Sequence, residues 1–422
     1  MLLASIVLLF SSCSKSSESV FVSVKDGQFF YQNAPYTYIG TNFWYGAILA
    51  STGQGGDRNR LERELDYMQS IGINNLRILV GSDGRRGVPS KVEPTLQIMP
   101  GVYNDTILDG LDYLMVELKE RNMFAVLYLN NAWEWSGGYS QYLEWAGYDP
   151  APIPRIDGWP AYITYVQQFV NSDSAKQLFS NYLTDIITRK NRYSGELYIN
   201  DPSIMSWQIG NEPRAFNEAN KAAFATWMSQ VSAQIRNLDP NHLISTGSEG
   251  KHGCEEDLDL WRKITADPNI SYANIHIWPY NWGWVSPDSL IEKLPAAIQN
   301  TDRYIQEHYE ISSKYGKPLV LEEFGFPRDG FTFNKTTPVT ARTAYYEAIF
   351  NHIVKKSDKK PLLNGCNFWS WAGFAEPIST WWTVGADYTG DPAQEEQGLN
   401  SVFASDSITI DLIKKYAKKI RQ

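Results

Sequence analysis

Short apolar runs alternate with amphipathic segments along most of this chain. Eight of the runs have the length and the aliphatic, β-branched content of buried strands. They cover residues 36–42, 75–80, 124–130, 204–209, 243–246, 273–278, 319–323 and 364–369. Apolar residues recur at helical spacing in the intervening segments, as in residues 58–71, 106–121, 218–238 and 338–355. Strands that alternate with helices in this way predict a parallel sheet.

Polar residues mark the expected starts of several elements. Asp57, Asp105 and Asn217 stand at the beginning of three helical segments, where their side chains can accept hydrogen bonds from free backbone N–H groups. Further upstream, residues 21–38 alternate in polarity around Asp26-Gly27, and Asp-Gly is typical of a tight hairpin turn. We therefore expect an N-terminal β-hairpin ahead of the first strand of the main sheet.

A barrel and a doubly wound sheet are both compatible with this alternation. A doubly wound nucleotide-binding fold would place a Gly-rich phosphate loop after the first strand, whereas this chain has Gly40-Thr41-Asn42-Phe43-Trp44. The sequence thus predicts an α/β fold of the (β/α)8 TIM-barrel type, with the hairpin closing its lower end. Residues 131–160 and 372–399 are enlarged βα-loops rich in Gly, Pro and aromatic residues. Loops this long are usually functional or disordered, and the aromatic content favours function.

The first residues have the character of a targeting segment. Residues 1–10 are almost wholly apolar, too short a run for a membrane span but typical of a signal peptide. Leu9-Phe10-Ser11-Ser12-Cys13 resembles a bacterial lipobox, in which the cysteine carries lipid. We expect residues 1–20 to be a lipoprotein signal and tether and residues 21–422 to be one barrel domain. The protein would then be extracytoplasmic, either lipid-anchored through Cys13 or secreted.

Composition narrows the possible partners. The chain carries 47 acidic against 38 basic residues, for a net charge of -9, and its basic residues gather only in short runs such as the tail at 414–421. This excludes nucleic acid as the expected partner. With five His and three Cys, we do not expect a metal site built from these residues. We also expect no cofactor. Cys254 and Cys366 are either two buried free thiols, which we favour, or a disulfide.

Two glutamates follow predicted strands on opposite sides of the barrel. Glu212 lies in Asn211-Glu212-Pro213 after the fourth strand, and Glu323 in Glu323-Phe324-Gly325 after the seventh. Both would stand at the mouth of the barrel, where this fold carries its chemistry. Glycoside hydrolysis needs such a pair, about 5–5.5 Å apart for retention of configuration and about 6.5–9.5 Å apart for inversion. Salt bridges to rim arginines are the alternative, but two glutamates in such compact strings favour catalysis.

These two strings are similar to the acid/base and nucleophile motifs of glycoside hydrolase family 5. Five further strings resemble its endo-β-1,4-mannanase subfamily, and the resemblance runs from about residue 21 to the C-terminus. They are GTNFWYG at 40–46, LRI at 76–78, STGSEG at 245–250, HIWP at 276–279 and FWSW at 368–371. The resemblance implies a retaining endo-β-1,4-mannanase that cuts internal bonds of mannan, galactomannan or glucomannan. Another family 5 β-1,4-glycanase, or a non-catalytic glycan-binding surface lipoprotein, are the alternatives.

The resemblance also assigns roles to particular residues. Glu212 would be the acid/base and Glu323, rather than its neighbour Glu322, the nucleophile. Strand alternation agrees, because it would point Glu322 outward toward the helices when Glu323 points into the mouth. Asn211 would hydrogen-bond the 2-hydroxyl of the reacting sugar. Arg77 would lie beside Glu323 and lower the pKa of that carboxyl group.

Other residues would complete the sugar site. His276 would join the network around the two carboxylates, with a purely structural histidine as the alternative. Trp369 would form the floor under the sugar, and Arg214 and Glu249 would be sugar contacts. Many family members have Tyr where Trp278 stands, and the indole N–H could replace the tyrosine hydroxyl as a donor to the nucleophile.

The 15 tryptophans are unevenly placed along the chain. Trp207, Trp227 and Trp261 fall inside strands or helices and are expected in the core. The other twelve lie at strand ends or in the loops after the first, third, sixth and eighth strands. They are Trp44, Trp133, Trp135, Trp145, Trp159, Trp278, Trp282, Trp284, Trp369, Trp371, Trp381 and Trp382. Some must only pack the loops, but a row of indoles beside two carboxylates suits a polysaccharide, and we expect Trp44 among the sugar contacts.

Overall fold

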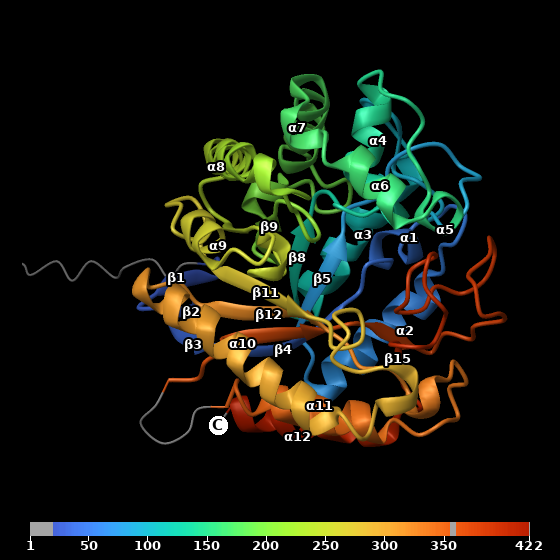
Figure 1. The fold of residues 1–422 in the computed structure, drawn as a ribbon, viewed down its shortest axis with the longest axis vertical. Helices are drawn as coiled ribbons and strands as arrows, with labels where there is room; N and C mark the ends of the chain where they lie inside the picture. The colour runs from blue at the N-terminus through green and yellow to red at the C-terminus, as the bar shows by residue number, and fades with distance from the viewer. Residues whose placement is uncertain (1–19, 355–359, 422) are drawn as a thin grey trace, which may run out of the picture.

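The computed structural model describes residues 20–354 and 360–421. Eight parallel strands form a nearly closed barrel, and the hydrogen-bonded sheet has β10 and β11 at its edges (Figure 1). The strands are β4 (Tyr38–Asn42), β5 (Asn75–Leu79), β8 (Phe124–Tyr128), β9 (Ile204–Gln208), β10 (Leu243–Ser245), β11 (Ala273–Ile277), β12 (Leu319–Phe324) and β13 (Gly365–Phe368). Each lies within two residues of its predicted bounds, so the predicted (β/α)8 barrel is confirmed.

Helices surround this barrel and alternate with its strands. They are α2 (Arg58–Ile71), α3 (Asp105–Glu120), α7 (Asp173–Ile187), α8 (Lys221–Leu238), α9 (Leu258–Thr265), α10 (Leu294–Lys314), α11 (Thr340–Phe350) and α12 (Ser407–Ile420). Asp57 caps α2 as predicted, because its side chain accepts a hydrogen bond from the Arg60 backbone. Asn217 likewise caps the turn that leads into α8. The predicted cap Asp105 is wrong: Asn104 caps α3, and Asp105 is the first helical residue.

The N-terminal segment closes the lower end of the barrel. Strands β1 (Ser23–Lys25), β2 (Gln28–Tyr31) and β3 (Ala34–Tyr36) form an antiparallel sheet. The turn Asp26-Gly27 has positive φ at both residues, 52° and 72°, as a two-residue hairpin requires. Val22 and Phe29 pack against apolar side chains from the lower parts of the barrel strands, among them Val126 and Val320. The predicted hairpin and its position are therefore confirmed.

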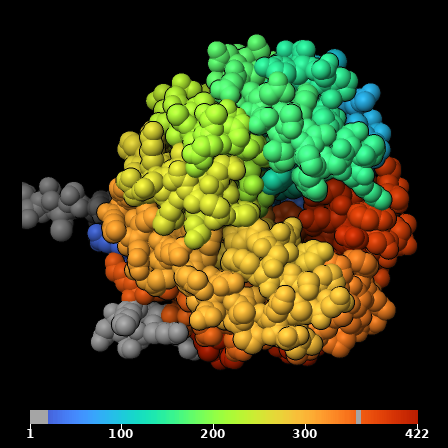
Figure 2. Space-filling model, viewed as in Figure 1, coloured from blue at the N-terminus to red at the C-terminus, as the bar shows by residue number. Residues whose placement is uncertain are grey.

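The two enlarged loops lie at the other end. The first contains α4 (Gly138–Trp145), α5 (Pro154–Asp157) and the start of α6 (Trp159–Val166). The second, residues 372–399, is held by Asp391, whose carboxylate accepts hydrogen bonds from the backbones of Gly398 and Asn400. The Arg155 guanidinium lies 3.8 Å from the centre of the Trp381 ring and joins the two loops. In Figure 2 this face is hollowed where the cyan-green, yellow-orange and red parts of the chain meet.

The described chain also has smaller elements. They are α1 (Gly46–Leu49), the pair β6 (Gln97–Met99) and β7 (Val102–Tyr103), and the pair β14 (Trp371–Gly373) and β15 (Val402–Phe403). Cys254 and Cys366 are both buried free thiols, as we favoured. The predicted signal and tether, including Cys13, lie outside the described residues. None of the described helices has the length and apolar character needed to cross a membrane.

Candidate active site

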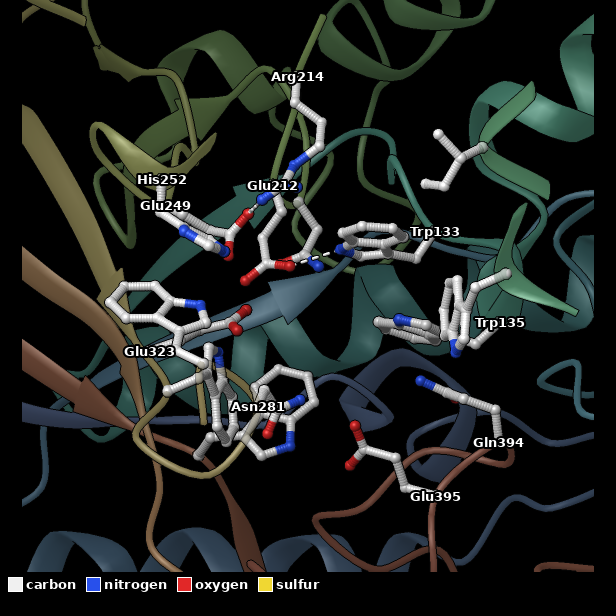
Figure 3. A pocket seen from close by; sticks show the side chains of 16 residues that line it. Trp133, Trp135, Glu212, Arg214, Glu249, His252, Asn281, Glu323, Gln394 and Glu395 are labelled. Carbon is white, nitrogen blue, oxygen red and sulfur yellow. Dashed lines mark hydrogen bonds and ion pairs between the residues drawn. The ribbon is translucent and has the colours of Figure 1, made fainter. Parts of the chain in front are cut away.

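A cavity of about 500 Å³ opens at the carboxyl ends of the barrel strands. Strand β9 leads into Glu212 and strand β12 carries Glu323, and both side chains line this cavity. Figure 3 shows the two carboxylates facing each other near its centre. One oxygen of each carboxylate and one ring nitrogen of His276 lie within 4.8 Å of one another. This close approach is compatible with the carboxyl pair of a retaining glycosidase, about 5–5.5 Å apart.

The backbone holds Glu212 in an uncommon conformation. Its φ is 51°, in the left-handed region that side-chain-bearing residues adopt only uncommonly. The Glu212 N–H donates to the Gly247 carbonyl oxygen at 2.9 Å. Its carboxyl group lies 2.9 Å from His276 Nδ1, within hydrogen-bond distance, and accepts a hydrogen bond from Trp133 Nε1. These contacts fix the direction in which Glu212 presents its carboxyl group to the cavity.

A single buried arginine organises the other side. The Arg77 guanidinium donates to a carboxylate oxygen of Glu323, to Asn211 Oδ1 at 2.8 Å and to Asn42 Oδ1 at 3.0 Å. The predicted position of Arg77 beside Glu323 is confirmed. The same guanidinium orients Asn211, so the nucleophile candidate and the residue expected at the sugar 2-hydroxyl are positioned together.

Burial and mutual repulsion set the charge of the pair. Burial raises the pKa of Glu323 well above its ordinary value; Arg77 opposes this rise, and the nearby Glu212 adds to it. Burial also raises the pKa of Glu212. Because like charges this close disfavour double ionisation, the pair retains one proton, and the direct contact with Arg77 favours the negative charge on Glu323. Burial lowers the pKa of His276 well below its usual value, so its ring is neutral.

The prediction that Glu322 points outward is wrong. Strand β12 has a bulge against β11: Ile275 pairs with Leu321, but the next residue, His276, pairs with Glu323. The extra residue, Glu322, is buried and accepts hydrogen bonds from Gln208 Nε2 at 2.6 Å and from the Tyr272 hydroxyl at 2.9 Å. A bulge interrupts the alternation of side chains between the two faces of a strand. Glu322 nevertheless does not line the cavity, so Glu323 remains the candidate nucleophile.

Most of the remaining predicted residues line the cavity. Arg214 and Glu249 form an ion pair beside Glu212, and Trp369 forms part of the wall. Trp278 also lies there, with its ring 6.0 Å from that of Trp369. Within the described chain its indole makes no hydrogen bond to Glu323, so it does not take the place of the tyrosine hydroxyl. The ring instead packs over the next strand end, where a Cβ added to Gly325 would lie 2.6 Å from it.

Trp44 is the predicted sugar contact that the structure does not place in the cavity. Its side chain is 3% exposed, and its Nε1 donates to the Gly390 carbonyl oxygen at 2.9 Å. The ring of Trp135 stands edge-on to it at 5.9 Å and occupies the cavity wall in its place. Trp44 therefore supports the wall from behind, because it lies one layer below the surface that a sugar would touch.

Several lining residues had no individual role predicted from the sequence. They are Trp133, Trp135, Trp159, Ile163, His252, Asn281, Trp282, Gln394 and Glu395. The tryptophans had been placed on the correct rim without individual roles. Glu395 had no motif around it, yet burial raises its pKa well above the ordinary value and its Oε2 is a buried atom with no hydrogen-bond partner in residues 20–354 or 360–421. Gln394 and Glu395 face the glutamate pair from the side of Trp135 (Figure 3).

Glu212, His276 and Glu323 are also of the residue types that bind divalent metal ions. In this site, however, the Arg77 guanidinium already contacts Glu323 and supplies the positive charge there. His276 directs one ring nitrogen at both carboxylates, 2.9 Å from Glu212 and 3.4 Å from Glu323. This arrangement is that of a carboxylate pair prepared for acid–base and nucleophilic chemistry.

Comparison with known proteins agrees with this geometry. A family model described as glycoside hydrolase family 5 beta-mannosidase-like matches residues 19–422. Mannan endo-1,4-beta-mannosidase 1 of Arabidopsis thaliana is 27% identical over 367 residues, which cover 82% of this chain and 80% of that protein.

Solved structures show the same relationship. The glycoside hydrolase family 5 mannosidase from Rhizomucor miehei is 32% identical, with a TM-score of 0.87 over 96% of this chain and 99% of that one. The endo-beta-1,4-mannanase from Thermotoga petrophila is 25% identical, with a TM-score of 0.68 over 91% of this chain and 76% of that one. With a family model that spans nearly the whole chain and a matching barrel, this protein belongs to glycoside hydrolase family 5, in its β-mannosidase-like group.

Proposed function

We propose that this protein hydrolyses β-1,4-mannosidic bonds of mannan, galactomannan or glucomannan with retention of configuration, as an endo-β-1,4-mannanase. The close pairing of Glu212 and Glu323 around the His276 ring nitrogen carries the proposal. The similarity to mannan endo-1,4-beta-mannosidases and to family 5 mannosidase and mannanase structures supports the choice of substrate.

The geometry supports a double displacement. The carboxylate of Glu323 attacks the anomeric carbon, while Glu212 donates its proton to the glycosidic oxygen as the bond to the leaving saccharide breaks. A water molecule then gives a proton to the Glu212 carboxylate and attacks the anomeric carbon of the mannosyl ester. The ester bond breaks, so Glu323 is again a carboxylate and Glu212 is again protonated. Neither step needs a metal or an organic cofactor.

The surrounding residues would hold the reacting sugar between the two glutamates. Asn211, oriented by Arg77, offers its amide to the 2-hydroxyl, whose hydrogen bond strengthens in the transition state. Trp369 provides an apolar surface below the ring. The Arg214–Glu249 pair lies on the side of Glu212, where the leaving saccharide would be.

A variant of Glu323 tests this function. Purified wild type, Glu323→Gln and the exposed control Glu310→Gln are assayed for new reducing ends on galactomannan and on carboxymethylcellulose. We expect wild type and control to cleave galactomannan and Glu323→Gln to lose at least about 10⁴-fold in kcat. Full activity of Glu323→Gln would contradict the mechanism, and a preference for cellulose would contradict the substrate. Binding of mannan by wild type without hydrolysis would favour a glycan-binding protein.

A second candidate function is the removal of single mannose units from chain ends. One observation favours it: the loop 372–399 brings Gln394 and Glu395 to the end of the cavity away from the leaving-group side. A chain that extends past the reacting sugar in that direction would meet this loop. The 32% identical structure is also a mannosidase.

Product analysis separates the two modes. Galactomannan viscosity is followed together with reducing-end release, and the products of mannohexaose are identified by chromatography. Internal cleavage predicts a steep fall in viscosity and oligosaccharide products. End-directed cleavage predicts mannose as the first product and little change in viscosity.

We also propose that the protein is extracytoplasmic and attached to a membrane by lipid on Cys13. The lipobox-like string at residues 9–13 supports this proposal. Expression of the full chain in a bacterial host with radiolabelled palmitate should label wild type but not Cys13→Ala. Release of unlabelled wild type into the medium would favour plain secretion.

A further inference from the structure

We propose that Glu322 is a positioning residue for the reaction: it is the anion that stays with Arg77 while Glu323 is bonded to the sugar. The proposal rests on the function proposed above, and it concerns a buried carboxylate that the double displacement does not otherwise use. The side chains of Arg77 and Glu322 are both fully buried, each 0% exposed. Because a buried charge without an opposite charge nearby is costly, the charge balance around Arg77 matters at every stage of the reaction.

Glu322 is connected to Arg77 through the side-chain amide of Gln208. Arg77 Nε donates to Gln208 Oε1 at 2.7 Å, and Gln208 Nε2 donates to Glu322 Oε2 at 2.6 Å. A guanidinium group has no acceptor, so Arg77 fixes the carbonyl end of the amide toward itself and the amino end toward Glu322. The dipole of the amide therefore lies between the cation and the anion, with each end toward the opposite charge.

The surroundings of Glu322 favour its ionised form. Its other oxygen, Oε1, accepts a hydrogen bond from the Tyr272 hydroxyl at 2.9 Å. Burial raises the pKa of Glu322, and the charge of Arg77 and the two hydrogen bonds oppose that rise. Burial alone would lower the pKa of Arg77, but the charges of Glu323 and Glu322 raise it above its ordinary value. Arg77 is thus a cation shared between two carboxylates, one in direct contact and one behind Gln208.

The first chemical step takes the direct partner of Arg77 away. One carboxylate oxygen of Glu323 bonds to the anomeric carbon, the glycosidic bond breaks, and the proton of Glu212 passes to the leaving oxygen. The negative charge of the pair therefore moves from Glu323 to Glu212. Its contacts there, within the described chain, are with His276 and Trp133, and Arg77 is not among its ion-pair partners.

Glu322 keeps its charge throughout this step, because it lies outside the cavity and exchanges no proton with the substrate. It therefore compensates Arg77 in the ester form of the enzyme, when Glu323 offers only uncharged oxygens. Loss of the Glu322 charge would destabilise the ester relative to the free enzyme. Formation of the ester should then slow and its hydrolysis should quicken, since the second step restores the carboxylate of Glu323.

The test measures the two steps separately with 2-deoxy-2-fluoro-β-mannosyl fluoride. The fluorine at C2 slows both steps and the anomeric fluoride leaves readily, so the ester accumulates and intact-protein mass spectrometry follows its formation and its hydrolysis. Glu322→Gln keeps the shape of the side chain and removes its charge. We expect it to lower the ratio of the formation to the hydrolysis rate constant about tenfold, through the loss of one partly screened charge. A merely structural role of Glu322 would change the amount of folded enzyme and leave this ratio unchanged.

Asp112→Asn is the matched control. Asp112 is also 0% exposed, accepts a hydrogen bond from the Tyr198 hydroxyl at 2.6 Å and pairs with Arg189, but it lies outside the cavity. This variant should keep the wild-type ratio. A wild-type ratio in Glu322→Gln would overturn the inference while the proposed function stands. Wild type that neither forms the ester nor cleaves mannan would overturn both.

A second variant decides the matter if Glu322→Gln fails to fold. Tyr272→Phe keeps the aromatic ring and removes the hydroxyl that favours the ionised form of Glu322. The ratio of formation to hydrolysis should fall in the same direction by a smaller factor, about threefold. An unchanged ratio in Tyr272→Phe would then overturn the inference.

Discussion

The two ends of the active-site cavity differ in how their polar groups are satisfied. At one end, Glu395 is drawn into the cavity by the loop 372–399, and one of its buried oxygens has no partner within the described residues. At the other end, the polar groups around Trp282 are already paired, as in Lys251–Glu307 and His252–Glu256. The aromatic rings there are partly exposed.

This difference indicates two kinds of recognition. A buried polar atom without a partner is costly and gains most from a ligand that hydrogen-bonds it in one orientation. Ring faces with satisfied charges around them bind many sugars in several positions. The Glu395 end is thus suited to select one particular sugar, whereas the Trp282 end is suited to hold leaving saccharides of varied length. Glu212 stands between them, and in the proposed mechanism it protonates the bond on the side of the second end.

The largest effect is expected at the acid/base. Glu212→Gln should lower kcat/KM for mannotetraose about 10²- to 10⁴-fold, the usual contribution of a general acid. An aryl β-mannoside with an acidic phenol leaving group should lose far less in the first step, because that group departs without a proton. The exposed control Glu218→Gln should match wild type on both substrates. Equal losses on the two substrates would contradict the assignment of Glu212 to the leaving-group side.

A smaller effect is expected from the selective end. Glu395→Ala removes a buried polar contact to the sugar, so kcat/KM should fall about 10- to 100-fold. The fall should be the same for mannobiose and mannohexaose, since both place one mannose unit between the glutamate pair and that end. Glu376→Ala is the control, because Glu376 is an exposed glutamate of the same loop. A loss that grows with substrate length would remove the contrast between the two ends.

A few-fold effect is expected at Trp133, whose indole donates to Glu212. Trp133→Phe removes a donor that stabilises the ionised carboxylate, so the pKa of Glu212 should rise. Glu212 must be protonated to act as an acid, and the alkaline limb of kcat/KM should therefore move to higher pH, with about a fivefold loss at the optimum. Trp159→Phe, a cavity tryptophan without that bond, should leave the limb in place. A shift to lower pH would contradict the role of Trp133.

The pH profile of the wild-type enzyme tests the glutamate pair without any substitution, and its expected effect is the smallest. Activity requires Glu323 ionised and Glu212 protonated, so it is lost as pH falls through the first pKa and as pH rises through the second. Burial raises the pKa of both groups. Both limbs of kcat/KM against pH should therefore lie above the ordinary glutamate pKa of about 4.3. An alkaline limb at or below that value would contradict a buried, coupled pair.

The barrel could be predicted from sequence because buried parallel strands are continuous apolar runs whose ends are marked by polar residues. The same signal located Glu212 and Glu323, which follow such runs. It failed for Glu322, because the bulge between β11 and β12 depends on the neighbouring strand. It failed also for Trp44, since a position beside a strand end does not tell whether the ring faces the cavity or the layer behind it.

The position of Glu395 in the cavity could not be predicted from the sequence, for a further reason. Its place depends on the path of the loop 372–399, which is set by hydrogen bonds from Gly398 and Asn400 to Asp391 and from Trp44 to Gly390. Contacts of this kind leave no periodic pattern in the chain. The residues that distinguish one member of a common fold from another therefore lie in the part of the sequence that local rules describe least well.

The apolar layer beneath the barrel has a consequence for the order of events in each turnover. Because Val22, Phe29 and their neighbours fill the lower end, water and saccharide must share the upper opening. In the proposed double displacement, the released saccharide lies beside the mannosyl ester on the path that water takes. A saccharide that stays firmly bound after the first step would therefore delay the second.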